Sequence, residues 1–436
     1  MANKSLGNAT KVATMLHSNC IFAEIDGAIR RITMEDFETA MNEGQSALLH
    51  EVAWGIPIKD AIQTSPAWGM VGNLAAYTSY KAKVGRYLMD SSGRAAKLHK
   101  NDSSIFADGT TLDETKGSVV VLAPRLYYRL VTDAETSIPY LWMSEVPISG
   151  HFLANADNGN KIAIGAYKGS VSNGQLVSRR GVNFDTAGRT ITSYWNLAQA
   201  FGANWGLMNY DVWRWVAMMC LCETNGNANI QTGIGQGIGG ASGYTWSSVL
   251  SSTTLRLTGQ TSSLGDETGS VAVSGANADS THVSVLGVED FWNLQWEFIQ
   301  NVFFGNSGNS GQTGTEIFLY SGNRLPSASE LASHPSGEYR QLTRLTSSGY
   351  VGEMTKGEYF DIFASVLGSG SNTKWCDYYY ANSTGQVLLG GGRSEHGSAS
   401  GPFCAGSDAA WSLASSHLGA RPAYYGVITI VDGANL

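Results

Sequence analysis

Charged side chains are scarce in this 436-residue chain. Asp, Glu, Lys and Arg make up 15% of it, whereas about 25% is typical of soluble domains. The balance is acidic, since 36 Asp and Glu against 28 Lys and Arg give a formal net charge of −8. Binding to a phosphate backbone requires a basic surface, so nucleic acid is not an expected partner. Because 43% of the residues are hydrophobic, the chain should still fold around a sizeable core.

Cysteine is also rare, and no two cysteines form a CxxC pair. Five cysteines are an odd number, and without a CxxC spacing they predict neither a disulfide framework nor a zinc knuckle. The five are Cys20, Cys220, Cys222, Cys376 and Cys404. The longest strongly apolar run, Trp215 to Cys222, is far shorter than the ~18 residues of a membrane span, and no apolar signal core follows the N-terminal lysines. We therefore expect no membrane insertion.

Motifs for catalysis and for cofactor binding are missing as well. The eight histidines include no HExxH pair, and the chain has neither a GxSxG elbow nor a GxxxxGK[ST] phosphate loop. The glycine run from Gly233 to Gly240 lacks the strand, helix and ribose acid of a dinucleotide site. Carboxylate neighbours such as Glu289 and Asp290 do not by spacing alone predict glycoside hydrolysis. The sequence predicts no enzyme, no metal site and no cofactor.

Residues 1–60 differ in texture from the rest of the chain. Asp26-Gly27 stands between apolar alternations, which predicts a hairpin. Thr33, with Asp36 three residues later, resembles a capping box at the start of a helix carrying Phe37, Ala40 and Met41. A small hairpin-and-helix module is the simplest interpretation, followed by a connector or shoulder over residues 61–117.

Residues 118–436 form a strand-rich domain in this interpretation. Ser118–Leu122, Leu126–Leu130 and Tyr140–Trp142 are predicted strands, and Ser193–Phe201 is a predicted helix. A second helix is predicted over Asp211–Glu223, with Asp211 able to cap its start. Because that helix is apolar almost all round, it should be buried. The stretches 225–243 and 305–314, rich in Gly, Asn and Ser, are predicted loops within this domain.

The C-terminal region carries the most informative pattern. Strands bracket a long, irregular stretch of mostly small residues that begins after Gly392, which cannot bury much apolar area and so should lie on the surface of a scaffold. Phe403 and Trp411 are its large side chains, and Glu395, His396 and Asp408 are polar. Aromatic anchors among small adaptable residues are typical of recognition surfaces. Phe403 and Trp411 could each equally be core residues beneath a loop.

An ordered series of short segments along 118–436 resembles the C-type-lectin-fold domains of phage receptor-binding proteins, including the retroelement-diversified variable proteins of the tropism-determinant type. The segments are Trp142-Met-Ser144, Ile164-Gly-Ala-Tyr167, Trp205-Gly-Leu207, Tyr210–Glu223, Asn229-Ile-Gln231 to Gly235, Gly287–Trp292 with Trp296-Glu297, Gly390-Gly-Gly392 and Gly419-Ala-Arg421. The N-terminal segment Ala23–Ile32 is similar to short virion-anchoring segments of phage fibre proteins.

The resemblance implies an α+β fold with two helices against antiparallel sheets, and a ligand face displayed just before the last strand. Gly390–Gly392, Trp292, Trp296, Gly419 and Arg421 would be scaffold. By position, the ligand-binding residues would be Tyr378, Tyr380, Ser394, Glu395, His396, Ser398, Ser400, Phe403, Ala405, Ser407, Asp408 and Trp411. The EPN or QPD and WND motifs of calcium-dependent sugar-binding lectins are missing, which argues against calcium in the site.

The resemblance further implies a bacteriophage virion protein, a tail or head fibre, that binds a protein or glycan receptor on the bacterial surface. The N-terminal module would attach to other virion proteins, and a homotrimer is expected by analogy with phage fibres. One alternative is a decoration or head-fibre protein with a mainly structural role. The other is an enzyme related to the formylglycine-generating enzymes, which use a pair of cysteines; here only Cys404 lies in the matching region.

Overall fold

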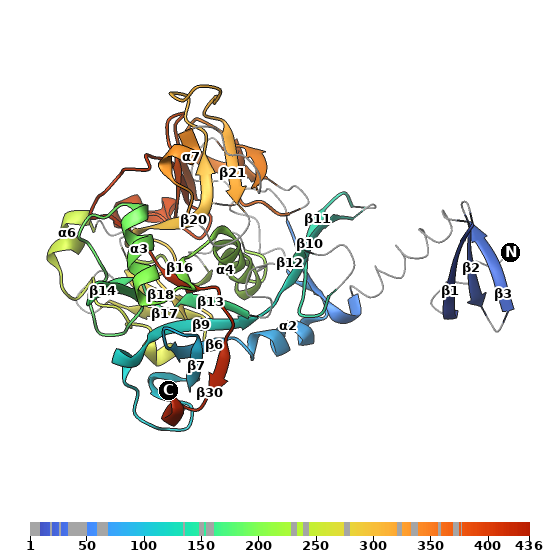
Figure 1. The fold of residues 1–436 in the computed structure, drawn as a ribbon, viewed down its shortest axis with the longest axis horizontal. Coiled ribbons are helices and arrows are strands. Elements are labelled where there is room, and N and C mark those ends of the chain that lie inside the picture. The colour runs from blue at the N-terminus through green and yellow to red at the C-terminus, as the bar shows by residue number, and fades with distance from the viewer. Residues whose placement is uncertain are drawn as a thin grey trace.

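The chain folds into a mixed structure of many β-strands and few helices, which confirms the α+β class (Figure 1). The structure is a computed structural model. It describes residues 9–17, 20–25, 28–33, 50–58, 69–133, 136–147, 152–153, 161–227, 233–238, 244–273, 280–320, 325–332, 339–355, 359–368, 375 and 377–436.

The N-terminal strands form a sheet of their own. It is antiparallel and consists of β1 (Ala9–His17), β2 (Cys20–Ile25) and β3 (Ala28–Thr33). Ile25 pairs with Ala28, so only two residues join β2 to β3, and the predicted hairpin is confirmed. The sequence analysis missed β1, and the helix predicted after Thr33 lies outside the described residues.

A five-stranded sheet comes next, with the order β12-β10-β11-β4-β5. Its strands are β4 (Trp54–Pro57), β5 (Val71–Gly72), β10 (Tyr127–Thr132), β11 (Pro139–Ser144) and β12 (Phe152–Leu153). The strands predicted near 126 and 140 are therefore confirmed. Helix α2 (Leu74–Lys81) comes after β5 and begins at Asn73, whose side chain accepts a hydrogen bond from the backbone of Ala76.

An eight-stranded sheet crosses the domain boundary predicted at residue 117. Strand β6 pairs with β9 over five residues, so the expected connector and the expected C-terminal domain share one sheet. Because β4 also pairs with β11, residues 54–57, which the sequence interpretation put in the N-terminal module, belong to this body too. The sheet contains β6 (Gly85–Met89), β7 (Arg94–His99), β8 (Asp102–Phe106), β9 (Ser118–Pro124), β13 (Lys161–Gly165), β16 (Trp205–Leu207), β29 (Pro422–Tyr424) and β30 (Thr429–Val431).

The C-terminal half builds a nine-stranded sheet around β20 (Trp296–Phe304), all nine residues of which are buried. Its other strands are β21 (Glu316–Tyr320), β22 (Tyr339–Thr343), β23 (Gly349–Met354), β24 (Ala364–Leu367), β25 (Tyr378–Ala381), β26 (Val387–Gly390), β27 (Ala405–Ala409) and β28 (Leu418–Gly419).

Smaller elements complete the chain. The strands are β14 (Ser170–Ser172), β15 (Gln175–Val177), β17 (Gly269–Ala272), β18 (Thr281–Val285) and β19 (Val288–Glu289). The helices are α3 (Ile191–Phe201), which confirms the predicted helix, α6 (Trp246–Ser251) and α7 (Ala328–Ala332). The 3-10 turns are η2 (Glu114–Lys116), η3 (Ser262–Leu264), η4 (Ser394–Ala399) and η5 (Gly433–Asn435).

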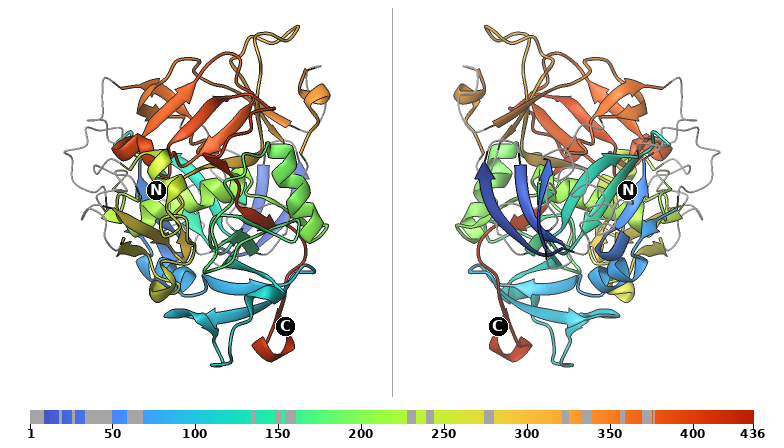
Figure 2. Two further views of the ribbon diagram at one scale, coloured as in Figure 1. Left: turned by 90° about the vertical axis from the view of Figure 1, so that its left-hand side faces the viewer. Right: turned by 90° about the vertical axis from the view of Figure 1, so that its right-hand side faces the viewer.

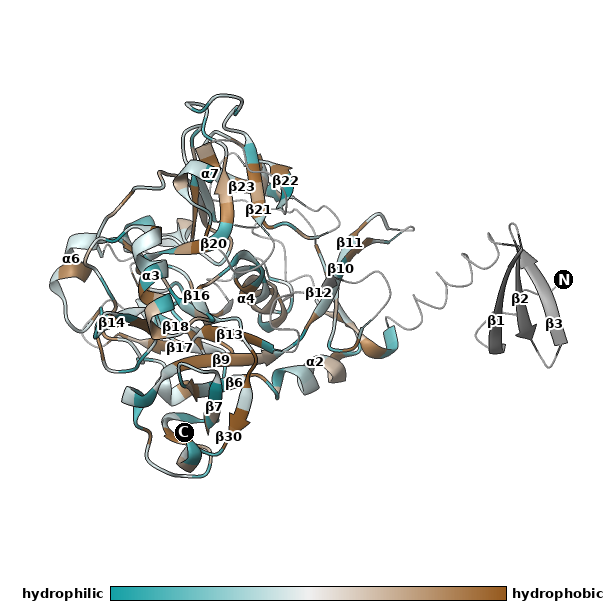
Figure 3. Cartoon of the chain, viewed as in Figure 1, coloured by the Kyte–Doolittle hydropathy of each residue, from teal (hydrophilic) through white to brown (hydrophobic). Residues whose placement is uncertain are grey.

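Helix α4 (Tyr210–Glu223) lies between the two large sheets. It contacts β20 of the nine-stranded sheet and β13 of the eight-stranded sheet. Figures 1 and 2 show the orange strands on one side of the molecule and the cyan strands, with the red strand β30 beside them, on the other, while Figure 3 shows hydrophobic residues along β9 and β13. Residues 212–222 of α4 are all buried, which confirms the prediction made from the apolar surface of this helix.

Two polar features let this helix sit in the core. Its N-cap is Asn209, whose side chain accepts from Val212 N at 2.9 Å, so the prediction of Asp211 as the cap was wrong. Asp211 instead binds the buried Arg214 at 2.7 Å. The Arg214 guanidinium also donates to the carbonyl of Tyr359 and lies 4.7 Å from the ring centre of Tyr128. Every one of these contacts offsets part of the cost of burying the cation.

A second buried cation, Arg421, joins strands from both large sheets. It donates to the carbonyls of Gly165, Ala166 and Glu289 at 3.0, 3.1 and 2.8 Å, and to the Glu297 carboxylate at 3.2 Å. Its side chain is fully buried. Because these acceptors belong to segments far apart in sequence, one side chain fixes their relative positions, which agrees with its expected scaffold role.

We predict that Arg421→Met lowers the free energy of unfolding by about 3 kcal/mol or more, because the Glu297 charge and three carbonyls lose a buried partner. Urea unfolding measures this change. Arg94→Met is the control, since Arg94 is 44% exposed and pairs with Asp90 at the surface. Equal stability losses in the two variants would contradict the prediction.

Candidate functional site

The predicted ligand residues lie on and around β25 and β27, two neighbouring strands of the nine-stranded sheet. These strands run parallel, with Tyr380 opposite Gly406, and β26 pairs antiparallel with β27 on the other side. Strand β23 borders β25, with Tyr350 opposite Tyr378. The sheet therefore carries the expected face on rigid paired strands, whereas the sequence suggested a long irregular stretch.

Alternation along these strands divides the predicted residues between two faces. Successive side chains of a strand point to opposite sides, so Tyr378 and Tyr380 share one face. Tyr379, between them, points the other way and meets Ser407, with 2.7 Å between their hydroxyl oxygens. Ala405 and Ser407 therefore face the interior, while Asp408 is exposed on the opposite side.

Five of the twelve predicted residues are buried, and their expected display is corrected. They are Ser394, Ser400, Phe403, Ala405 and Ser407, each at most 2% exposed. The reason is that β27 has a neighbouring strand on each side, and the residues just before it are buried in the core. Phe403 packs against Trp375 with ring centres 4.8 Å apart. It is a core residue, the alternative that the sequence left open.

Four half-buried aromatic side chains form what we call the tyrosine strip: Tyr350, Tyr378, Tyr380 and His396. The ring centres of Tyr350 and Tyr378 are 5.0 Å apart, and those of Tyr378 and Tyr380 are 4.5 Å apart. His396 stacks on Tyr380 at 4.7 Å, above the buried Trp296. The structure thus brings three predicted residues together and adds Tyr350, which only strand pairing could reveal.

Charged groups border the strip at η4. Arg393 and Glu395 form an ion pair at 2.7 Å. Glu395 is exposed and also accepts a hydrogen bond from the backbone of Trp246, which ties η4 to α6. Ser398 is exposed as well. These groups frame the aromatic rings with polar atoms, an arrangement typical of binding surfaces.

His396 titrates far from its ordinary range. Burial of the ring, together with the nearby Arg393 cation, lowers the pKa of His396 to about 4. At neutral pH the ring is therefore uncharged. A neutral imidazole stacked on tyrosine extends the strip as an aromatic surface without a charge.

Trp411 lies apart from the strip in a shallow hollow. It is half-buried, and its ring centre lies 5.3 Å from that of Phe303. The hollow has a volume of about 350 Å³, and Trp195, Asn196 and Pro326 also line it. Trp411 is thus part of a surface depression, but its indole rests on the core and contributes to stability too.

A buried arginine supports the loops behind this face. Arg344 donates to the carbonyls of Gly314, Gly305 and Gly385 at 2.9, 3.1 and 3.0 Å, and to that of Ser407. Its guanidinium also lies 4.4 Å from the ring centre of Phe304. The Gly-rich loop 305–314 is therefore fastened to β27. Nothing local in the sequence distinguishes Arg344 from a surface arginine.

We predict that Phe403→Ala lowers the free energy of unfolding by about 3 kcal/mol or more, because it opens a cavity beside Trp375. Leu413→Ala, a truncation at a position that is 37% exposed, should cost less than about 1 kcal/mol. Denaturant unfolding of both variants measures the difference. If the Phe403→Ala variant has the same free energy of unfolding as the parent, the Phe403 ring of the parent would have to lie at the surface.

We also predict a pH dependence from His396. The unfolded chain binds the proton near pH 6.5, whereas the folded chain does so only near pH 4, so folded-state stability falls as the pH drops from 6.5 towards 4. NMR titration of the imidazole, assigned with His396→Gln, measures the pKa directly. That variant should lose part of the acid sensitivity, whereas His50→Gln, changed at an exposed position, should keep it. A titration midpoint of His396 at 6.5 or above would refute the prediction.

The Cys404 thiol is fully buried, and burial raises its pKa well above the ordinary value. Within the described part of the chain, no three His, Cys, Asp or Glu side chains gather to hold a metal ion, and no helix has the length and apolarity to cross a bilayer.

Comparison with the models of known protein families gives no match, and comparison with curated proteins gives none either.

Proposed function

We propose that this chain is a bacteriophage virion protein, a tail or head fibre, that binds a receptor on the bacterial surface. The observation that carries the proposal is the tyrosine strip. Its four rings stand half-exposed on adjoining strands and a 3-10 turn, at the place where the sequence resemblance puts a ligand face. In this proposal the protein adheres to the receptor and does not convert a substrate.

The physical chemistry of the strip suits recognition. Tyrosine offers a large flat surface and a hydroxyl, and it loses little conformational freedom on binding since only two torsions must be fixed. Here the rings already support one another, and Trp296 lies beneath Tyr380 with ring centres 5.7 Å apart. A receptor would therefore meet a surface that needs little further ordering, which favours affinity.

We further propose a C-type-lectin-like fold for the part of the chain around this face. Two helices, α3 and α4, pack against sheets that are largely antiparallel, and the strip lies shortly before the last strands. The sheet of β1, β2 and β3 pairs with no other strand among the described residues, so it suits attachment to other virion proteins. A homotrimer would present several strips at once, and linked weak sites gain avidity.

The alternatives make different use of the same surface. A decoration or head-fibre protein with a structural role would pack the strip against a virion neighbour. An enzyme of the formylglycine-generating type would need reactive cysteines, and a buried Cys404 whose pKa is raised is a poor nucleophile at neutral pH. We therefore favour adhesion.

We predict that Tyr378→Ala in the full chain weakens binding to host cells by about ten-fold or more, since buried tyrosine anchors dominate such interfaces. Binding is measured with fluorescently labelled protein on a panel of bacterial strains that includes the natural host. The melting temperature should change little, because the Tyr378 ring is half-exposed.

Tyr140→Ala is the matched control. Tyr140 is also a half-buried strand tyrosine, but it stacks on Trp142 in the five-stranded sheet, which contains no residue of the strip, so its loss should leave cell binding unchanged. A folded Tyr378→Ala protein that binds as well as the parent would disprove recognition through the strip. No binding of the parent to any strain would favour the structural alternative.

A further inference from the structure

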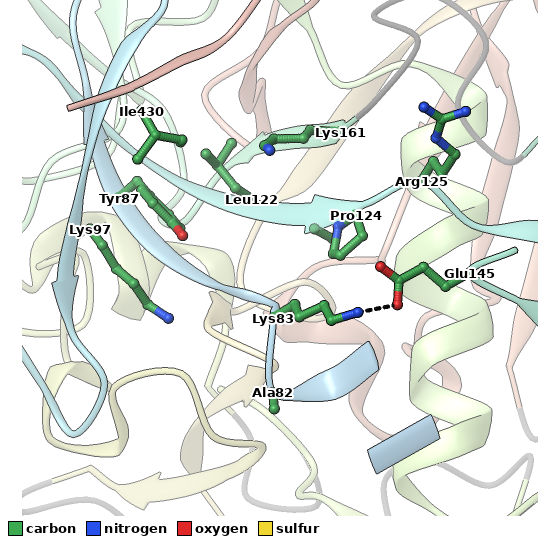
Figure 4. Close-up of a pocket in the computed structure, with 11 residues that line it drawn as sticks. Ala82, Lys83, Tyr87, Lys97, Leu122, Pro124, Arg125, Glu145, Lys161 and Ile430 are labelled. Carbon is green, nitrogen blue, oxygen red and sulfur yellow. Dashed lines mark hydrogen bonds and ion pairs between the residues drawn. The ribbon is translucent and has the colours of Figure 1, made fainter. Parts of the chain in front are cut away.

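Two hollows in the described part of the chain differ in chemistry. The larger, of about 670 Å³, is shown in Figure 4, and side chains of opposite charge meet in it, with Lys83 Nζ 2.6 Å from Glu145 Oε2. The smaller is the hollow of about 350 Å³ at Trp411. We call it the tryptophan hollow, because Trp195 lines it as well. Its walls are aromatic where those of the larger hollow are charged.

The tryptophan hollow is assembled from three separate segments. Thr192, Trp195 and Asn196 belong to α3 and have the spacing of residues on one side of a helix. Pro326 lies just before α7, and Trp411 follows β27. Both tryptophans are half-buried and pack against the same cluster of buried residues. The fold thus exposes parts of two indoles in one depression.

Hydrogen bonds hold the α7 side of the hollow in a fixed shape. Ser327 and Glu330 form a capping box, in which Glu330 N donates to Ser327 Oγ at 3.2 Å and Ser327 N donates to Glu330 Oε2 at 2.8 Å. Gln312 Nε2 donates to the carbonyl of Leu331 at 2.7 Å, which fastens α7 to the loop 305–314. The hollow is therefore preformed, and a ligand would not have to order this wall.

Uncharged polar groups accompany the indoles. Glu330 is the one charged side chain among the described lining residues, and its carboxylate already accepts from the backbone and the hydroxyl of Ser327. Thr192 and Asn196 add a hydroxyl and an amide, and Asn196 is exposed. Flat aromatic surface with a few neutral donors and acceptors suits a ligand that has apolar faces and a polar edge.

We propose that the tryptophan hollow binds an uncharged sugar ring. The C–H faces of a pyranose can pack against an indole, while its hydroxyls need hydrogen-bond partners of the kind that Thr192 and Asn196 offer. The volume lies at the lower end of the range of about 300–1,000 Å³ for small-molecule sites. The hollow shares no lining residue with the tyrosine strip, so this inference does not rest on the adhesion proposal.

The test titrates neutral saccharides into the full chain. The probes are the methyl glycosides of glucose, galactose, mannose and N-acetylglucosamine, with choline for comparison because a quaternary ammonium ion also binds aromatic rings. Saturation-transfer NMR and indole fluorescence follow the binding. We expect at least one sugar to bind saturably, with an affinity that added salt leaves unchanged because no ion pair forms. Binding of choline alone, or of no probe, would overturn the proposal.

Variants decide whether the sugar occupies the hollow. Asn196→Ala should weaken binding by about five-fold, whereas Asn101→Ala, the same change at an exposed residue between β7 and β8, should not. Trp411→Ala removes an aromatic wall and should weaken binding by about ten-fold or more. Equal binding by the parent and by folded Asn196→Ala and Trp411→Ala proteins would place the sugar elsewhere and overturn the proposal.

Two controls separate this test from stability and from adhesion. The Trp411 indole also rests on the core, so melting temperatures verify folding, and Asn196→Ala, changed at an exposed position, decides the matter if the tryptophan variant unfolds. Tyr378→Ala should bind the sugar as the parent does, since Tyr378 does not line the hollow. Sugar binding and cell binding can therefore fail separately.

Discussion

Burial of helix α4 on every side is the constraint on which the remaining structure depends. This helix has no polar side that could face water, because Val212, Trp213, Trp215 and Val216 point in different directions, so it must be enclosed. The eight-stranded sheet covers it on one side and the nine-stranded sheet on another. Residues of the five-stranded sheet and of α2 close a third side, where Trp215 Nε1 donates to the Tyr80 hydroxyl at 2.9 Å.

Enclosing one helix with three sheets brings many chain segments together, and buried arginines fix their positions. Arg421 bonds to β20 and to the ends of β13 and β19, while Arg86 bonds to Gly287, Ser103 and Thr261. A buried guanidinium has five donors in a fixed plane, so it binds several carbonyls only if they hold one arrangement. Each guanidinium therefore fixes the arrangement of the chain segments that it joins.

Local patterns were enough to predict much of this fold. The hairpin at 20–33, the strands at 118 and 140 and the helices α3 and α4 each have a periodicity or turn signal within a short window. The pairing of β6 with β9 crosses the boundary predicted at residue 117, and strand pairing between distant segments leaves no local signal.

The candidate site shows the same division between local and distant information. Tyr378 and Tyr380 were predicted by position from the resemblance, and the structure puts both on one side of β25 because two residues separate them along the strand. Phe403 was misplaced because its burial depends on Trp375, and Tyr350 was missed because only the pairing of β23 with β25 brings it to Tyr378.

The bonds made by Arg344 end on main-chain oxygens of Gly305, Gly314, Gly385 and Ser407. Main-chain oxygens are present whichever side chains occupy the strands. The outward positions beside them, such as 378, 380 and 408, can therefore exchange one residue type for another without loosening these attachments. The framework is in this sense evolvable, because new surfaces can arise by substitution while the backbone that presents them stays the same.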